Sequence, residues 1–98
     1  MKSAQRKTRH RNVAALTAFD MAGKVIERHE IPLDEYYERL HELIDSNEYR
    51  SSRGIVIVEG QLFDPSGHLD QEFRIQYSST GAYEGGRTVH ADGTIIEN

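Results

Sequence analysis

A tyrosine and two arginines lie close together in the polar segment 47–53, as Tyr49, Arg50 and Arg53. Tyrosine and arginine are favoured where one macromolecule binds another. Guanidinium groups pair with phosphates or carboxylates, and a tyrosine ring offers a surface on which a base can stack. We therefore interpret this segment as a contact loop.

The segment 78–87 repeats this chemistry in a glycine-bearing stretch that contains Tyr83 and ends on Arg87. It has neither the lysine nor the spacing of a P-loop, so the sequence does not predict a nucleotide site here. Long connections in small domains are uncommon unless they are functional or mobile. Two interpretations stay open: a second contact loop, and a flexible linker whose tyrosine packs on a sheet edge.

Residues 1–11 form a basic arm that contains no acidic residue. Its basic residues are Lys2, Arg6, Lys7, Arg9 and Arg11. The rest of the chain keeps seven of the 12 basic and all 16 acidic side chains, which gives it a net charge of −9. Such an arm either contacts nucleic-acid phosphates or is a frayed terminus that lies back on an acidic body. If the arm and segment 47–53 shared one face, together they would form a phosphate-binding surface.

The remaining reactive residue types do not form a catalytic or metal-binding motif. The absence of cysteine excludes disulfides, thiolate zinc sites and cysteine nucleophiles. The serines lack a nucleophile-elbow motif. No two histidines have the helical spacing of a metal-binding pair: His10, His29, His41, His68 and His90. Five carboxylates fall on the polar arc of a predicted helix, where a solvated face is favoured over an acid–base pair: Asp34, Glu35, Glu38, Glu42 and Asp45. We expect no catalytic residue, no metal and no cofactor.

Two segments are versions of one another, Phe19–Val25 and Phe63–Leu69. Each contains the pattern Phe-Asp-x-x-Gly after an apolar stretch. The aspartate can accept hydrogen bonds from its own backbone, and Gly23 or Gly67 can adopt the left-handed conformation. The repeated pattern predicts two hairpins, each closed by a three-residue loop with a bulge.

Six apolar residues between positions 33 and 44 have helical spacing, which predicts an amphipathic helix: Leu33, Tyr36, Tyr37, Leu40, Leu43 and Ile44. Pro32 suits the start of this helix, and Ser46-Asn47 suits its end. Strands are predicted on either side of the helix, with Gly60 marking a bulge, over residues 13–19, 24–31, 55–58 and 69–77. Residues 88–90 and 94–96 are predicted to form a third, small hairpin or a swapped edge.

The order hairpin, helix, hairpin (ββαββ), followed by a C-terminal hairpin, predicts an α+β domain with one helix packed on a mainly antiparallel sheet. This order resembles that of β-grasp folds, in which one helix crosses a four-stranded mixed sheet. The resemblance implies no function, because that fold hosts many unrelated ones. Composition changes near Asn12, so we expect a flexible arm over 1–11 and a single α+β domain over 12–98.

Three functions from different classes fit these features. The first is a small non-enzymatic interaction module, of inhibitor or adaptor type, that binds a partner protein through loops, strand edges and charged faces. Self-association through strand edges belongs to this first function. The second is a nucleic-acid-binding accessory protein that uses the basic arm. The third is a small-molecule binder or enzyme whose pocket forms between subunits.

The sequence also bears on the location of the protein. No apolar run approaches the ~18 residues that a membrane-spanning helix needs. The basic start is not followed by the apolar region of a secretory signal. We therefore expect a cytoplasmic protein with a macromolecular partner, a protein in preference to a nucleic acid, and no membrane partner.

Overall fold

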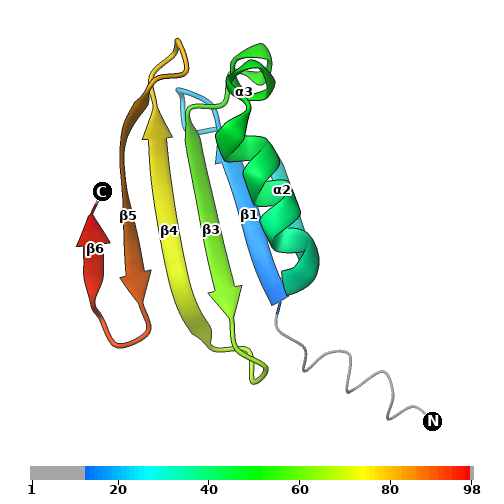
Figure 1. Ribbon diagram of the computed structural model, residues 1–98, viewed down its shortest axis with the longest axis vertical. Coiled ribbons are helices and arrows are strands. Elements are labelled where there is room, and N and C mark those ends of the chain that lie inside the picture. The colour runs from blue at the N-terminus through cyan, green and yellow to red at the C-terminus, as the bar shows by residue number, and fades with distance from the viewer. Residues whose placement is uncertain (1–12, 98) are drawn as a thin grey trace, which may run out of the picture.

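The computed structural model of the protein describes residues 13–97. Within them, six strands form one open sheet in the order β2-β1-β3-β4-β5-β6, and two helices lie on one of its faces (Figure 1). The fold is therefore α+β. The elements are β1 (Val13–Phe19), β2 (Val25–Pro32), α2 (Leu33–Asp45), α3 (Asn47–Arg53), β3 (Ile57–Phe63), β4 (Leu69–Tyr77), β5 (Tyr83–His90) and β6 (Ile95–Glu97).

All neighbouring strands of this sheet are antiparallel, which differs from the mixed sheet of a β-grasp fold. The difference follows from the connection after β2. Helix α2 runs back along the sheet, so β3 enters at the end where β1 finishes and descends beside it (Figure 1). Strand β1 therefore lies between β2 and β3, and the rest of the chain adds β4, β5 and β6 as a meander.

One type of turn closes all four hairpins. The two turns expected from Phe-Asp-x-x-Gly are confirmed at 20–24 and 64–68, and the same backbone hydrogen bonds recur at 78–82 and 90–94. In each turn the first N–H donates to the carbonyl of the fifth residue, and the glycine N–H donates back to the first carbonyl. The four glycines have φ between 83° and 95°. A side-chain oxygen at the start of three turns, from Asp20, Asp64 or Ser78, accepts two further backbone N–H bonds.

The predicted amphipathic helix is confirmed as α2, with Pro32 before it and Ser46 after it. Its apolar face packs on β1 and β3, where small residues of β1 let the helix lie close to the sheet. Tyr36 and Leu43 of α2 are buried there. The core consists of Ala14, Leu16, Ala18, Tyr36, Leu43, Ile55, Val58 and Tyr77.

The segment 47–53 is helix α3, so its assignment as a loop was wrong. The Ser46 hydroxyl accepts a hydrogen bond from the Tyr49 N–H and caps the start of the helix. Gly54, with φ of 74°, ends the helix in the left-handed conformation. These two caps are local signals that the single-helix prediction missed.

The sequence predicts a loop over the whole segment 78–87, but only residues 78–82 form one. The turn ends at Ala82, and β5 begins at Tyr83. Gly85 and Gly86 lower the intrinsic strand propensity of β5, but pairing with β4 supplies the backbone hydrogen bonds of this strand. The small C-terminal hairpin is confirmed, with β5 and β6 as its strands.

Gly60 does not mark a bulge, because the pairing of β3 is continuous through it on both sides. The break in the β3–β4 register lies between Leu62 and Phe63 instead. A side chain at position 60 would occupy the space that the Phe73 ring and the Tyr36 hydroxyl fill. Gly60 therefore allows two aromatic residues to pack directly on the strand backbone.

Burial raises the pKa of the Tyr36 hydroxyl far above its ordinary value of 10.0, and the neighbouring Tyr37 adds to this effect. The unfolded chain ionises near pH 10 and the folded chain does not, so this contribution to stability is complete below that pH and decreases above it. We expect urea denaturation between about pH 8 and 11 to show a declining free energy of unfolding in the wild type and a weaker decline in Tyr36→Phe. The exposed Tyr37 supplies the control, Tyr37→Phe. Equal pH dependence in the wild type and Tyr36→Phe would contradict this assignment.

Candidate functional site

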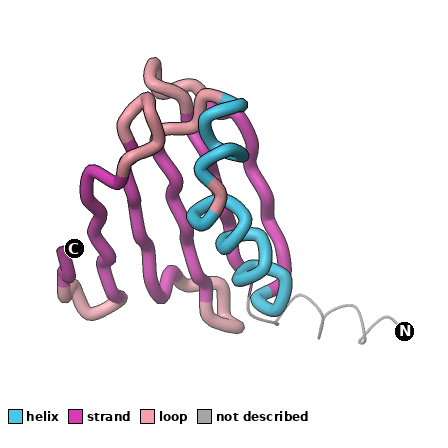
Figure 2. Tube along the Cα trace, turned by 45° about the horizontal axis from the view of Figure 1, so that its top comes forward, coloured by secondary structure: helices cyan, strands magenta, loops and turns pink. Residues whose placement is uncertain are grey.

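Helix α2 covers one part of the sheet and leaves the rest of the same face open. Its contacts are with β1, β2 and β3, whereas β4, β5 and β6 lie beside it without a helix above them (Figures 1 and 2). A groove of about 150 Å³ runs between the side of α2 and this uncovered area. We call it the open groove, and it is lined by Leu40, Ile44, Phe73, Ile75, Arg87 and Thr88.

Apolar side chains of the open groove are only half-buried. Ile96 of β6 pairs with Thr88, which places it on the groove face, and it is 49% exposed. Sequence reasoning assigned Leu40 and Ile44 to the buried stripe of the helix and did not identify this surface. The sequence does contain a signal for this surface. The apolar stripe of the helix is broader than the part of the sheet that one helix can cover.

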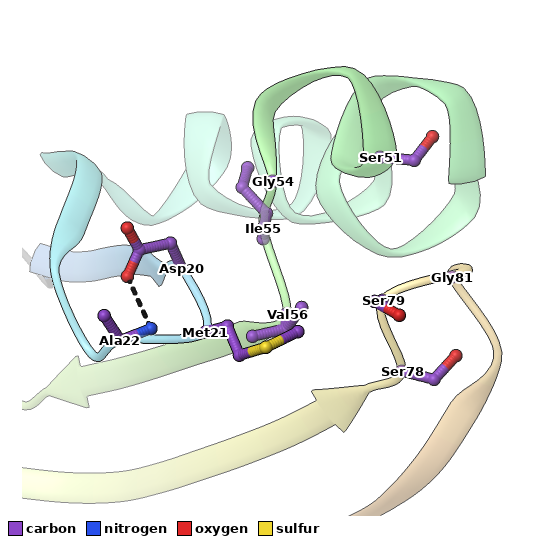
Figure 3. A pocket seen from close by; sticks show the side chains of 10 residues that line it. All are labelled: Asp20, Met21, Ala22, Ser51, Gly54, Ile55, Val56, Ser78, Ser79 and Gly81. Carbon is purple, nitrogen blue, oxygen red and sulfur yellow. Dashed lines mark hydrogen bonds between the residues drawn. The ribbon is translucent and has the colours of Figure 1, made fainter.

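A second hollow, of about 370 Å³, lies at the end of the sheet where two turns and the segment between α3 and β3 meet (Figure 3). The β1–β2 turn contributes Met21, which lines the hollow together with Val56. The β4–β5 turn contributes two serines from the opposite side. The lining residues are Asp20, Met21, Ala22, Ser51, Gly54, Ile55, Val56, Ser78, Ser79 and Gly81.

The polar groups of this end hollow are mostly engaged in local structure. The Asp20 carboxylate accepts hydrogen bonds from the backbone of its own turn. The Ser51 hydroxyl donates to the Asn47 carbonyl, and the Ser78 hydroxyl accepts from its turn. The floor is aliphatic, so the hollow suits an apolar group better than a charged one.

Arg50 is 4% exposed and ties three parts of the fold together. One terminal nitrogen, Nη1, donates to the carbonyls of Leu43 and Ile44 at 2.9 and 2.8 Å, and Nη2 donates to the Gly81 carbonyl at 3.0 Å. Its guanidinium lies 3.7 Å from the centre of the Tyr77 ring. This corrects the assignment of Arg50 to a contact surface: its charge is used inside the protein.

Tyr49 and Arg53 lie together on α3, with the Arg53 guanidinium 3.8 Å from the centre of the Tyr49 ring. The Tyr49 hydroxyl donates to the Glu27 carboxylate, at 2.9 Å from Oε2. Burial and this hydrogen bond raise the pKa of Tyr49. The Tyr49 side chain is thus part of the contact between α3 and β2, and Arg53 is the exposed member of the pair.

Tyr83 and Arg87 both lie on β5, which follows the β4–β5 turn that Arg50 of α3 contacts through the Gly81 carbonyl. Tyr83 is 53% exposed and packs edge-on against Tyr77, with ring centres 6.2 Å apart. Arg87 is exposed and pairs across the sheet with Arg74 of β4 and Glu97 of β6. The residues named in the two predicted contact segments therefore lie on different elements, α3 and β5. Arg87 is open to solvent.

The five basic residues of the arm lie outside the described residues: Lys2, Arg6, Lys7, Arg9 and Arg11. Val13, where the described chain begins, pairs with Pro32 beside the start of α2. Helix α3 follows the other end of α2, at the opposite end of the sheet (Figure 1). The phosphate-binding surface expected from the arm and α3 stays a prediction.

Within residues 13–97, histidines and carboxylates form no group of three that could hold a metal ion. No helix in the same range is long and apolar enough to cross a membrane. Comparison of the chain with protein-family models, curated proteins and solved structures found no match, so its function must be inferred from its own geometry.

Proposed function

We propose that this protein is a small non-enzymatic interaction module that binds a partner protein, as an inhibitor or adaptor does. The open groove is the observation that carries the proposal. It combines an aliphatic helix side with an uncovered sheet, and Phe73 and Ile75 form its floor. Removing such half-exposed apolar surface from water favours association with a partner.

The chemistry of the groove favours a protein as the partner. Aliphatic and aromatic side chains gain from contact with the apolar side chains of another protein, whereas a phosphate backbone gains from cations. The residues after the arm carry a net charge of −9, which opposes the approach of a nucleic acid. The end hollow, with its aliphatic floor, is suited to receive a single apolar side chain from the same partner.

The test uses two neighbouring isoleucines of β6 that have similar exposure and lie on opposite faces. Ile96 pairs with Thr88, on the face of the sheet that holds the open groove, and is 49% exposed, while Ile95 pairs with Val89 on the other face and is 54% exposed. We expect Ile96→Glu to abolish binding of the partner protein, because a carboxylate beside the open groove must be desolvated when the partner covers this face. Ile95→Glu should leave binding unchanged.

The measurement is native mass spectrometry of each variant after recovery from its own cell. A stoichiometric protein partner that is lost with Ile96→Glu and retained with Ile95→Glu supports the proposal. Recovery of a nucleic acid in place of a protein would favour the basic arm as the functional element. Equal binding by both variants would refute a role for the open groove.

A further inference from the structure

The face of the sheet turned away from the helices carries a layer of long polar side chains. Leu16 of β1 packs beneath α2, so the alternating positions Ala15 and Thr17 point to the opposite face. We call this opposite face the back face, and no helix of the described chain lies on it (Figure 1). Ala15 and Thr17 are nevertheless only 3% and 7% exposed, so the longer side chains of β2 and β3 beside them cover both.

Contacts within the chain hold this layer of side chains in place. The pairs and their distances are Arg28–Thr17 (2.8 Å), Arg28–Glu30 (2.9 Å), Gln61–Glu72 (2.9 Å) and Arg74–Glu59 (3.6 Å). A surface whose side chains are already ordered loses less conformational entropy when a partner binds to it. The back face is therefore prepared for a contact.

Two rows of side chains cross the back face from β2 to β6. Cross-strand pairing gives the first row as Arg28, Thr17, Glu59, Arg74, Arg87 and Glu97. It gives the second row as Glu30, Ala15, Gln61, Glu72, Val89 and Ile95. Together the rows hold three arginines and four glutamates, so this face is nearly neutral, whereas the chain after the arm has a net charge of −9. Two copies of this acidic chain repel each other least when they approach through this face.

The charges of the two rows are complementary to themselves. A two-fold axis that runs along the strands, between β3 and β4, places β3 of one copy over β4 of the other and β1 over β5. Glu59 then faces Arg74 of the second copy, and the symmetry repeats this contact. The other opposed positions are Thr17 and Arg87, Arg28 and Glu97, Ala15 and Val89, Gln61 and Glu72, and Glu30 and Ile95. No position in either row faces a like charge.

A second copy also adds negative charge where a single chain holds two arginines side by side. Arg74 and Arg87 are direct cross-strand neighbours, an arrangement that is unfavourable for like charges. The Glu59 carboxylate lies 3.6 Å from Arg74 of its own chain, and the two-fold axis brings Glu59 of the second copy to the same place. Two glutamates and two arginines then alternate about the axis. Facing sheets lie about 10 Å apart, a gap that glutamate and arginine side chains bridge when they extend from both sides.

We propose that the protein forms a two-fold symmetric dimer in which the back faces of two copies pack on each other. Aligned sheets cross at about 30°, so opposed positions match best near the axis, at Glu59 and Arg74. The dimer goes beyond the proposed function and does not depend on it. The open groove lies on the helix side of the sheet and stays accessible when the back face is covered.

The test reverses the charges at the axis one at a time. In a dimer of Glu59→Arg two positive charges face each other at both equivalent contacts, and in a dimer of Arg74→Glu two negative charges do. Analytical ultracentrifugation at low salt should show a wild-type dimer and at least about hundredfold weaker dimerisation of each variant. Arg39→Glu makes the same charge reversal on α2, at the other side of the sheet, and should dimerise as the wild type does.

An equimolar mixture of Glu59→Arg and Arg74→Glu separates the interface from the fold. The pair within one chain is exposed and contributes little to stability, so both variants should fold. In the mixed dimer unlike charges face each other at both contacts, so native mass spectrometry should detect a dimer of one copy of each.

Three results would each overturn the proposal: a wild type that stays monomeric up to about 1 mM, dimerisation that neither substitution weakens, or a mixture that stays monomeric. None of these results bears on the open groove, because the proposed function is decided by the comparison of Ile95→Glu with Ile96→Glu.

Discussion

Replacement of Arg50 by alanine is expected to lower the free energy of unfolding by about 3–5 kcal/mol, because the buried guanidinium and its hydrogen bonds are lost while the partner carbonyls stay buried. The substitution removes three hydrogen bonds and leaves the carbonyls of Leu43, Ile44 and Gly81 without that donor. It also removes the guanidinium from the Tyr77 ring. Arg50→Lys should recover only part of the loss, because an ammonium group cannot reproduce the planar fork.

Urea denaturation of Arg50→Ala, Arg50→Lys and a control measures this effect. The control is Arg53→Ala, because Arg53 lies on the same helix and also stacks on a tyrosine, but is exposed. Its loss should be about 0.5–1 kcal/mol, the value of an exposed cation–π contact. Comparable losses at positions 50 and 53 would show that Arg50 does not hold α3 and the β4–β5 turn to α2.

Substitution of Gly60 by valine is expected to destabilise the fold by about 3 kcal/mol or more, because it overpacks the space beneath α2. A Cβ atom built at position 60 lies 2.6 Å from Cζ of Phe73 and 2.7 Å from the Tyr36 hydroxyl. Both partners are aromatic, and Tyr36 is fully buried, so neither ring can move aside without shifting the helix or β4. Gly60→Ala should have the same direction and a smaller size.

A double-mutant cycle distinguishes this collision from a general loss of strand stability. Phe73→Ala alone removes a partly buried ring and should cost about 3 kcal/mol. In the presence of Phe73→Ala, the added cost of Gly60→Ala should fall to well under half of its value in the wild type. Additive losses would mean that the Phe73 ring is not the obstacle. Chemical denaturation of the four proteins supplies all the values.

The parts of the fold that follow from the sequence are those with local causes. The Asp-x-x-Gly pattern closes a hairpin through bonds within five residues, and α2 is specified by apolar spacing and by Pro32. Helix α3 is different, because its Arg50 is held by carbonyls of α2 and of the β4–β5 turn. Those partners are distant in sequence, so the polar segment 47–53 resembles a loop when it is considered alone.

The candidate sites depend even more on tertiary structure. The spacing of Leu40 and Ile44 shows that they share a helix face, but not that α2 stops short of β4 to β6. Arg74 and Arg87 become neighbours through the register of β4 and β5, which depends on a bulge next to Tyr77. Tyr83 and Arg87 could be named from residue type alone, whereas their place on β5, between β4 and β6, required the strand order.

The strand order also determines which step of folding causes the largest loss of configurational entropy in the chain. Four of the five strand pairings in the described chain join neighbours along the sequence through the same short turn: β1–β2, β3–β4, β4–β5 and β5–β6. The pairing of β1 with β3 alone, among the described strands, encloses a long segment of roughly 40 residues, and closing a loop of that length costs about 3 kcal/mol in configurational entropy. Prior formation of the β1–β2 hairpin and α2 shortens the effective loop. Most of the loop-closure entropy that this fold requires is therefore lost in a single step, the pairing of β1 with β3.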